Sequence, residues 1–560
     1  MPSPTSVAAL DGGPVGPRPK WGIEATGLVA LKLDPGLDAG FAYAAVALDG
    51  VVRDVDVHGH VCMSQLLLDP RTGKLPTAFL GQYFSASGAS PLATLLSRDD
   101  GPKNVVIMRH YFAKNEPFHC GLLLSADVHD SDDDDDDDEG GVTALENSRV
   151  CEYNAKAFRT GESAWVQVCK NRPGWSVFDV IVSGGLFHPK LSVARFDNAP
   201  RPFVRVIVSS ANMGAGRVFN VAWAQDFPVA KTAAATPTRF GADLQRFVYA
   251  FATLAGAKAN AKLERNLRAL NIFRGVDFSG ANGRLIYSLP PSVRRAFDKE
   301  GHKVGVDLLA EAVREANFLG NEPPCVFVNN VGNTDSAQTL EEADKTWFAR
   351  VARALGAVNE SEVEIIFPSL HNVLEHTFID GFSSMGYYAD ADFAAPGLRQ
   401  AVYCYDEPGR GPMWHDKMYF RFRSTPSASS DAACQQQACL GWMVLGSHNC
   451  SNAAWNGKNV ELSVMIRTSD AALLAHWKDV FPVRLPAPKY AVSNVSLPSN
   501  AYDKWGKDLH LPFTLGNGVA WVDERARAVL DKHKWLLEAQ GAFDAALAQH
   551  GAAKRARVQL

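Results

Sequence analysis

Two His-x-Lys triplets in the chain carry side chains that are suited to phosphate chemistry. One occupies residues 188–190 (His-Pro-Lys) and the other residues 415–417 (His-Asp-Lys). In a β-strand, residues i and i+2 point to the same face, so each triplet would place an imidazole beside an ammonium group. Imidazole can attack phosphorus or exchange protons near neutral pH, and an ammonium group can neutralise an anionic oxygen. The two triplets therefore indicate a site for a small anion, and phosphate is the obvious candidate.

Each triplet is followed by an apolar strand pattern and then by a Ser-x-Asn triplet, which adds a hydroxyl and an amide donor. A third His-x-Lys triplet, at residues 476–478, has a helical pattern and no Ser-x-Asn after it, so we interpret it as chance. The alternative for the first two is a pair of ordinary strand ends with solvated charges, and the repetition of the whole pattern argues against it. The members of the two copies are His188, Lys190, Ser210 and Asn212 in the first, and His415, Lys417, Ser447 and Asn449 in the second.

The repeated pattern resembles the HxK(x)nN signature of the phospholipase D superfamily and, within it, the tyrosyl-DNA phosphodiesterase 1 family. Most superfamily members carry an Asp five positions after the Lys, and this chain has Arg195 and Phe422 there. Residues 447–455 (SHNCSNAAW) are similar to the S-x-N-x-S-x-A-A-W box of the family, and Glu461 matches the Glu that follows the box. Asn220 stands where the family has Gln. The resemblance covers about residues 50–525.

This resemblance implies a reaction without metal or other cofactor, in which one histidine attacks phosphorus and the other exchanges protons with the leaving group and with water. Glu461 would orient one histidine, with a surface Glu as the alternative, and Asn220 would fix the other histidine or the attacking water. The residue types alone do not say which histidine attacks. The implied roles are His188 as nucleophile, His415 as general acid and base, and Lys190, Lys417, Asn212 and Asn449 as phosphate binders.

A second group of residues is expected to bind or orient the substrate. Serines of the two motifs could orient the phosphate-binding groups. Aromatic side chains near the motifs could stack on a base or a tyrosyl ring, although a core position is the alternative for each of them. The substrate-binding prediction comprises Ser210, Ser447, Ser451, Phe187 and Trp455.

The family resemblance implies a hydrolase that acts in the repair of DNA damage, removing 3′-phosphotyrosyl and related 3′-end adducts in the manner of an exonuclease. The expected substrates are single-stranded or nicked DNA 3′ ends that carry topoisomerase I remnants. The expected location is the nucleus, with the cytoplasm as a second possibility, and the expected state is a monomer. Two other classes remain open: another nuclease or phospholipase of the superfamily, and a non-catalytic nucleic-acid-binding relative.

Length and the strand–helix–strand pattern predict an α/β fold with two halves. The resemblance implies that these are two similar phospholipase D-like halves, each a mixed β-sheet flanked by helices and related by a pseudo-twofold axis. The 560 residues exceed one ordinary core. Pro189 predicts that its strand lies at a sheet edge or is bulged. The expected organisation is a disordered N-terminus at residues 1–20, an N-terminal half at 21–300 with an acidic loop at 127–146, and a C-terminal half at 301–560.

Composition excludes some classes of function. No apolar run approaches the roughly 20 residues of a membrane span, and the N-terminus lacks the pattern of a secretory signal. The 9 cysteines are scattered, which favours reduced thiols over a disulfide framework or a metal site. The net charge of −5 does not favour a surface that coats duplex DNA, although much of the negative charge lies in the block Asp132–Glu139.

Overall fold

A computed structural model of the chain describes slightly less than half of its residues. These are residues 28–32, 42–44, 60–62, 66–69, 72–84, 96–110, 149–152, 172–210, 218–230, 238–252, 258–294, 302–318, 320–328, 346–358, 362–368, 402–406, 413–414, 417–423, 439–480 and 483–486. The expected N-terminal segment 1–20 and the acidic loop 127–146 lie outside them.

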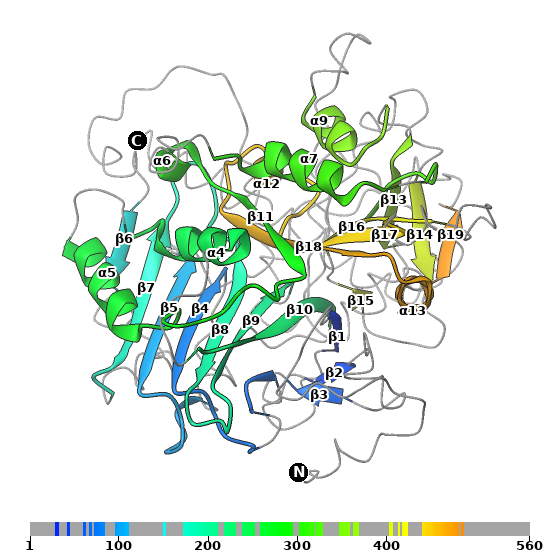
Figure 1. Ribbon diagram of the computed structural model, residues 1–560. Helices are drawn as coiled ribbons and strands as arrows, with labels where there is room; N and C mark the ends of the chain where they lie inside the picture. The colour runs from blue at the N-terminus through cyan, green and yellow to red at the C-terminus, as the bar shows by residue number, and fades with distance from the viewer. Residues whose placement is uncertain are drawn as a thin grey trace, which may run out of the picture.

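The first sheet has nine strands in the order β1-β10-β9-β8-β4-β5-β7-β6, with β15 beside β10 (Figure 1). The short strands β2 (Ala42–Ala44) and β3 (His60–Cys62) pair with each other separately. The members of the large sheet are β1 (Leu28–Lys32), β4 (Ala78–Tyr83), β5 (Asn104–His110), β6 (Arg149–Glu152), β7 (Trp175–Ile181), β8 (Lys190–Phe196), β9 (Phe203–Ser209), β10 (Val218–Pro228) and β15 (Met413–Trp414).

The second sheet has eight strands in the order β11-β18-β17-β16-β12-β13-β14-β19. Its inner strands are apolar and buried, as expected for a sheet that is covered on both faces. Its members are β11 (Gly283–Ser288), β12 (Cys325–Val328), β13 (Glu364–Pro368), β14 (Val402–Asp406), β16 (Lys417–Phe422), β17 (Gly441–Gly446), β18 (Glu461–Thr468) and β19 (Val483–Pro486).

The two sheets repeat the same pattern of strand directions. From β1 to β4 the neighbours pair antiparallel, β4, β5 and β7 pair parallel, and β6 closes the sheet antiparallel. From β11 to β12 the neighbours are again antiparallel, β12, β13 and β14 are parallel, and β19 is antiparallel. The predicted α/β fold with two similar halves is confirmed by this repetition.

The sheets do not divide at the predicted boundary near residue 301. Strand β11 precedes that residue and yet lies in the second sheet beside β18. Strand β15 follows it and pairs in parallel with β10 of the first sheet, through Val218↔Met413 and Phe219↔Trp414. Pairing with strands that are distant in sequence decides which sheet β11 and β15 join. A break in local composition does not reveal such pairing.

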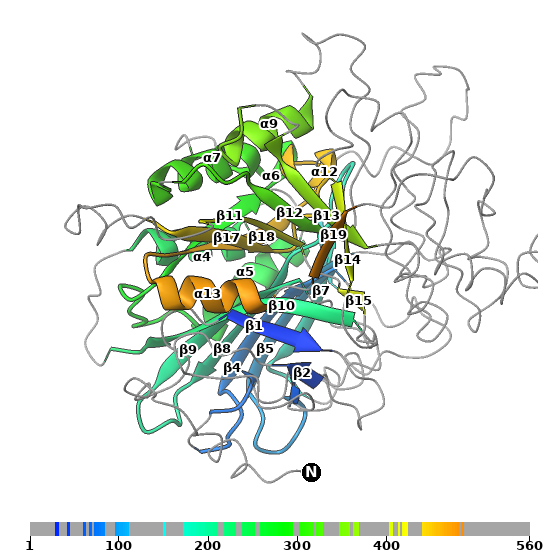
Figure 2. The same ribbon diagram turned by 90° about the vertical axis from the view of Figure 1, so that its right-hand side faces the viewer.

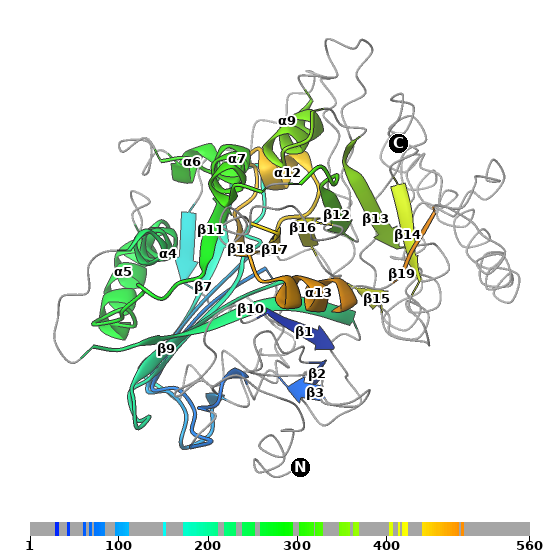
Figure 3. The same ribbon diagram turned by 45° about the vertical axis from the view of Figure 1, so that its right-hand side comes forward.

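Helices pack around the second sheet on both faces. Helices α7 (Gly305–Ala316), α9 (Trp347–Ala354) and the short α12 (Asn452–Trp455) lie on one side of it, and α13 (Ala471–Val480) lies on the other (Figures 2 and 3). Within the described residues, the other helices are α4 (Arg239–Tyr249), α5 (Lys258–Leu270) and α6 (Pro291–Arg294).

One continuous hydrophobic cluster connects the two sheets. It includes Val206 of the first sheet, Phe247 of α4 and Val464 of the second sheet, all of them buried. Helix α4 begins after Thr238, whose side chain accepts a hydrogen bond from Gly241 N at 3.1 Å. The shared core fixes the two halves against each other, so residues from both can form one site.

Two further findings bear on the sequence predictions. Strand β8 begins at Lys190 and pairs with β4 on one side and β9 on the other, so it is a central strand and Pro189 only precedes it. The prediction of an edge strand is therefore wrong, because a proline ahead of the first ladder residue removes no needed donor. In the described part of the chain, no helix has the length and apolarity to cross a membrane.

Candidate active site

The two motif lysines occupy equivalent positions in the two sheets. Lys190 is the first residue of β8 and Lys417 is the first residue of β16, and each side chain is buried. Burial and the charge of Lys417 both lower the pKa of Lys190 well below its usual value, while Glu461 acts in the opposite direction. The mutual effect of two buried ammonium groups indicates that the site is built to receive an anion between them.

A bridge between the two halves positions the first motif histidine. His188 N donates to Val460 O at 2.9 Å, and Val460 N donates to Leu186 O at 2.7 Å. Phe187 forms the corresponding parallel bridge with Val460. This short ladder brings the loop before β8 against the start of β18.

The imidazole of His188 is held at both nitrogen atoms. Its Nδ1 lies 2.8 Å from Glu461 Oε2 and its Nε2 lies 3.1 Å from Lys190 Nζ. The carboxylate accepts from Nδ1–H and the ammonium group donates to Nε2, so this arrangement fixes the proton on Nδ1 and leaves the lone pair on Nε2. The histidine and the glutamate are 273 positions apart in the sequence.

Glu461 is itself anchored by neighbours from the second half. Ser447 Oγ donates to Glu461 Oε2 at 2.5 Å, and Asn459 Nδ2 donates to Oε1 at 3.2 Å. Ser447 Oγ also accepts from Leu462 N at 2.9 Å. The carboxylate therefore has a fixed orientation toward His188.

Electrostatics favours a neutral imidazole at His188. Burial, then the charges of Lys190 and Lys417, lower its pKa well below the usual value. Burial raises the pKa of Glu461 to about 6, against the effects of His448, Lys190 and its hydrogen-bond donors. At pH 7 the pair therefore consists of a neutral imidazole and a carboxylate, which is the state of a nucleophile with a polarising partner.

Asn449 has hydrogen-bonding capacity left within this buried region. It is 8% exposed, and its Oδ1 has no hydrogen-bond partner among the described residues. An unpaired buried amide oxygen costs about 1–3 kcal/mol, so a bound ligand or water that satisfies the amide would be stabilising. This agrees with the expected role of Asn449 near the phosphate.

Three predicted site residues cannot be placed in full. His415 and Asn212 lie outside the described residues. The main chain of Asn220 lies in β10, opposite Leu31 of β1. Their roles stay predictions.

Four of the five residues that were expected to bind substrate make packing contacts or hydrogen bonds within the protein instead. Phe187 is fully buried and packs edge-on against Phe251, with ring centroids 5.1 Å apart. Trp455 is 1% exposed and donates through Nε1 to Tyr419 Oη at 2.9 Å. Neither ring offers a face to a substrate, so the prediction of direct stacking is wrong for both, and the core alternative holds.

The serines also differ in their roles from the prediction. Ser447 is fully buried and serves Glu461, and Ser451 caps α12 by accepting from Ala454 N at 3.3 Å. Ser210 follows β9 and is fully buried. Ser447 and Ser451 therefore fix Glu461 and the local backbone, which the sequence pattern does not distinguish from binding a phosphate, and the role of Ser210 stays a prediction.

A third histidine that the sequence analysis missed lies beside the first motif. His110, the last residue of β5, is buried and accepts from Phe187 N through Nδ1 at 3.2 Å. Phe84 stacks on it with centroids 5.3 Å apart and meets the His188 ring edge-on at 5.0 Å. Burial, then the influence of His188, lowers the pKa of His110 to about 3, so it is neutral. The sequence signal for His110 is a polar residue at the end of an apolar run that forms a buried parallel strand.

The second missed residue is His448, which lies inside the second motif. Its Nε2 is 3.0 Å from Ser288 Oγ, its Nδ1 is 2.7 Å from Ser463 Oγ, and its ring stacks on Trp455 at 4.2 Å. Burial lowers its pKa to about 4. The neutral ring links three elements and so holds the loop that carries Asn449.

The arrangement can bind an anion with ammonium groups and attack it with an imidazole. Among the residues that the structure describes, no group of His, Cys, Asp and Glu has the composition of a metal site. The positive charge near His188 comes from Lys190 and Lys417. This chemistry suits a phosphodiester, whose anionic oxygens repel nucleophiles unless they are neutralised.

A family profile and solved structures of one enzyme are similar to this chain. A sequence profile described as tyrosyl-DNA phosphodiesterase matches residues 161–515. Yeast tyrosyl-DNA phosphodiesterase has 12% identity over 80% of this chain and 90% of that chain, with a TM-score of 0.46. A mutant of the yeast enzyme has 13% identity over 70% and 82%, with a TM-score of 0.44.

The other comparisons are weaker. Phosphatidylserine synthase from Haemophilus influenzae has 11% identity over 72% of this chain and 79% of that chain, with a TM-score of 0.33. A search of curated proteins finds no match. The structural similarities carry no weight at these values, whereas the profile match spans more than half of the chain. The protein therefore belongs to the tyrosyl-DNA phosphodiesterase family and is a phosphodiesterase.

Proposed function

We propose that this enzyme removes tyrosyl and peptide remnants of topoisomerase I, and related adducts, from DNA 3′ ends through a covalent phosphohistidine. The observation that carries the proposal is the geometry of His188. Its Nδ1 is held by Glu461 at 2.8 Å, and its Nε2 faces the ammonium group of Lys190 at 3.1 Å. An imidazole with a fixed tautomer beside two cations is suited to in-line attack on a phosphodiester.

In the first step, His188 Nε2 attacks phosphorus while the bond between phosphorus and the tyrosyl oxygen breaks. The electron pair leaves on the phenolate, whose conjugate acid has a pKa of about 10, and His415 supplies a proton to it. Lys190 turns from Nε2 to a phosphate oxygen as the new P–N bond forms, and Lys417 neutralises a second oxygen. The Glu461 carboxylate balances the positive charge on the modified imidazole.

In the second step, water attacks the phosphohistidine. His415, now the base, takes a proton from the water as the new P–O bond forms. The P–N bond breaks, its electron pair returns to His188 Nε2, and a DNA 3′-phosphate is released. Asn212 and Asn449 hold the non-bridging oxygens in both steps, which offsets the charge of the pentacoordinate transition state.

The wider setting forms part of the same proposal. Because lysines supply the positive charge, turnover requires no metal ion. The substrates are single-stranded or nicked DNA ends, and the enzyme trims them in the manner of a 3′ exonuclease specific for the adduct. It acts as a monomer in the repair of damaged DNA in the nucleus.

Turnover of a 3′-phosphotyrosyl oligonucleotide in excess EDTA tests the proposal. We expect release of tyrosine and a DNA 3′-phosphate, and an acid-labile, base-stable adduct that joins the DNA 3′-phosphoryl group to His188 in peptides from quenched reactions. Phosphatidylcholine vesicles serve as the control for a phospholipase and should not be hydrolysed. Activity that is lost in EDTA and restored by Mg²⁺, or hydrolysis of lipid but not of the oligonucleotide, would reject it.

A further inference from the structure

The second half of the molecule holds the segment 186–188, which ends in the nucleophile, through alternate peptide groups. Leu186 N donates to Asn459 Oδ1 at 3.0 Å, and His188 N donates to Val460 O at 2.9 Å. Leu186 O accepts from Val460 N at 2.7 Å. Successive N–H groups of an extended segment point to opposite sides, so the amide of Phe187 faces away from the second half.

A histidine side chain of the first half accepts from this remaining amide. Phe187 N donates to His110 Nδ1 at 3.2 Å, and His110 is the last residue of β5 and is buried. Nδ1 can accept only when it carries no proton, so the contact requires a neutral ring with its proton on Nε2. Burial, and then the influence of His188, lower the pKa of His110 to about 3, which keeps the ring neutral well below pH 7.

An aromatic ring also connects His110 to the nucleophile. Phe84, which directly follows β4, stacks on the His110 ring with centroids 5.3 Å apart and meets the His188 ring edge-on at 5.0 Å. Glu461 holds Nδ1 of the His188 ring at 2.8 Å. A displacement of His110 would therefore change both the main chain before His188 and one wall of its ring.

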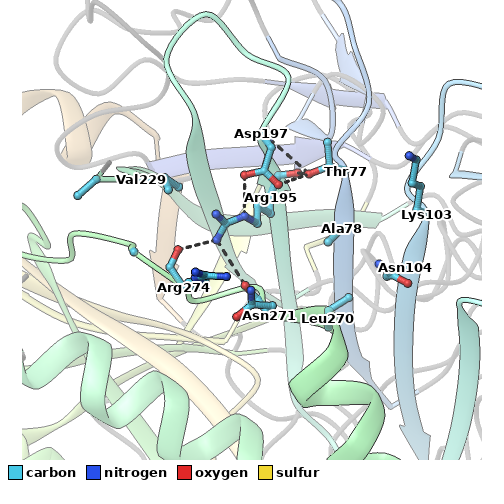
Figure 4. A pocket seen from close by; sticks show the side chains of 12 residues that line it. Thr77, Ala78, Lys103, Asn104, Arg195, Asp197, Val229, Leu270, Asn271 and Arg274 are labelled. Atoms are coloured by element: carbon cyan, nitrogen blue, oxygen red, sulfur yellow. Dashed lines mark hydrogen bonds and ion pairs between the residues drawn. The ribbon is translucent and has the colours of Figure 1, made fainter. Parts of the chain in front are cut away.

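The strands that carry His110 and Phe84 are fixed to their neighbours. At the end of the first sheet that is remote from the active site, Arg195 Nε donates to Asp197 Oδ1 at 2.8 Å, and Thr77 Oγ1 donates to Asp197 Oδ2 at 2.9 Å (Figure 4). These bonds join β8 to the start of β4, and β4 pairs with β5 along its whole length. The two side chains thus project from a rigid part of the scaffold, as precise placement of a reacting group requires.

We propose that His110 is a positioning residue for His188, which sets the main chain of the segment 186–188 and, through Phe84, the plane of the attacking ring. This inference rests on the function proposed above for His188. In-line attack requires that Nε2 be aligned with phosphorus, and a misplacement of about 1 Å can cost about a hundredfold in rate. His110 therefore acts on the rate of covalent capture and not on the affinity for the substrate, whereas a histidine with a role in folding alone would change neither in the folded enzyme.

Rapid-quench kinetics of two variants test the role of the acceptor. His110→Phe keeps a ring for Phe84 to stack on but has no acceptor, and His110→Asn places an amide oxygen near the position of Nδ1. With thymidine 3′-(4-nitrophenyl) phosphate, the burst of nitrophenolate reports attack by His188, because this leaving group needs no proton. We expect the burst rate of His110→Phe to fall about 10- to 100-fold, with the half-saturating concentration unchanged within about twofold. The rate of His110→Asn should lie closer to the native value.

Phe178→Leu is the matched control for a general loss of stability. Phe178 is fully buried in β7, two residues before Val180, which is the register partner of His110. The change should lower the midpoint of urea unfolding without changing the burst rate. A second measurement needs no variant enzyme to be active: ¹⁵N NMR of the native protein with labelled histidines should show His110 with its proton on Nε2, its signals being those that His110→Asn lacks.

Any of four results would overturn the inference. These are a native burst rate in His110→Phe, equal losses in His110→Phe and His110→Asn, an equal loss in Phe178→Leu, or a proton on Nδ1 of His110 at pH 7. Failure of the proposed function looks different. A native enzyme that turns over the nitrophenyl diester but not a 3′-phosphotyrosyl oligonucleotide would reject the proposed substrate, and the comparison of the variants would still decide the role of His110.

Discussion

Strands β10 and β18 occupy equivalent places in the two sheets but differ in the residue at one corresponding position. Ala222 pairs with Ser209 at the end of β9, and Ser463 pairs with Gly446 at the end of β17. Asn220 lies two residues before Ala222, and Glu461 lies two residues before Ser463. The two residues therefore occupy corresponding positions in the two sheets. Duplication of the scaffold therefore placed an amide in one half where the other half has a carboxylate.

This difference explains how two similar motifs can take different roles. A carboxylate beside an imidazole stabilises the positive charge that forms when the ring becomes phosphorylated, which suits His188 as nucleophile. An amide adds no charge, which suits the role proposed for His415 as a general acid and base. The register of Asn220 in β10 is the observation that favours such a partnership with His415.

The largest effect should come from replacing the histidine in each half. His188→Ala removes the nucleophile, so neither turnover nor a protein–DNA adduct is expected. His415→Ala should still allow attack when the leaving group is a phenolate, but hydrolysis lacks its base and should slow by about 10²–10⁴-fold. A denaturing gel should show an adduct with His415→Ala only. An adduct with His188→Ala and none with His415→Ala would reverse the assignment of the two halves.

Replacing Glu461 by an amide makes the two halves more alike at the position that Asn220 occupies in the first half. This change should reduce activity less than replacement of a catalytic histidine. Glu461→Gln keeps an acceptor for His188 Nδ1–H but removes the charge, and we expect kcat/KM to fall by about a hundredfold at pH 8. The active form of Glu461 is the carboxylate, which is lost as pH falls through its pKa of about 6. The native enzyme should therefore lose activity below about pH 6.

The Glu461→Gln variant should not lose activity in this way at acidic pH, because Gln does not titrate. If its pH–rate profile falls below about pH 6 as that of the native enzyme does, the loss of activity belongs to another group. Circular dichroism of the two proteins at pH 8 controls for folding.

A difference in the sheet cores predicts an effect on stability. Arg205 and Asp226 form a buried cross-strand ion pair in the first sheet, with Nε–Oδ1 and Nη2–Oδ2 distances of 2.6 and 2.7 Å. The equivalent cross-strand pair in the second sheet is Trp442 with Arg467, and Arg467 is exposed. Arg205→Met removes the cation that balances the buried Asp226 carboxylate and should lower the free energy of unfolding by about 3–5 kcal/mol.

The double variant Arg205→Met/Asp226→Leu is the control for this prediction. It removes both charges, so we expect urea unfolding close to that of the native protein, within about 1 kcal/mol. Equal destabilisation in the single and double variants would show that packing, and not charge, dominates at this position.

The smallest effect is expected from the acidic segment of the first half, which has no counterpart in the second. Deleting residues 130–140 should leave turnover at physiological salt and the melting temperature unchanged. The reason is that eight adjacent anions would oppose DNA if they lay within a Debye length of about 8 Å of the site. A several-fold fall in KM, largest at low salt, would instead show that the segment competes with DNA for the lysines.

Local patterns in the sequence were sufficient for the motifs and for the type of fold. The motif lysines Lys190 and Lys417 begin β8 and β16, and Ser210 and Ser447 directly follow β9 and β17, because apolar strand patterns and their polar ends are local properties of the sequence. Repetition of the motif also predicted two similar halves. The apolar runs at residues 203–208 and 440–446 became β9 and β17 for the same local reason.

Contacts across long stretches of sequence were decided by the tertiary structure. Pairing of β18 with β11 and bridging of Val460 to Phe187 bring Glu461 to His188, although 273 positions separate them. The same packing buried Trp455 and recruited His110, whose roles no spacing predicts. Register and strand order depend on the free energy of the whole core, so a sequence pattern can specify which groups are available, and only the folded sheets determine which of them meet.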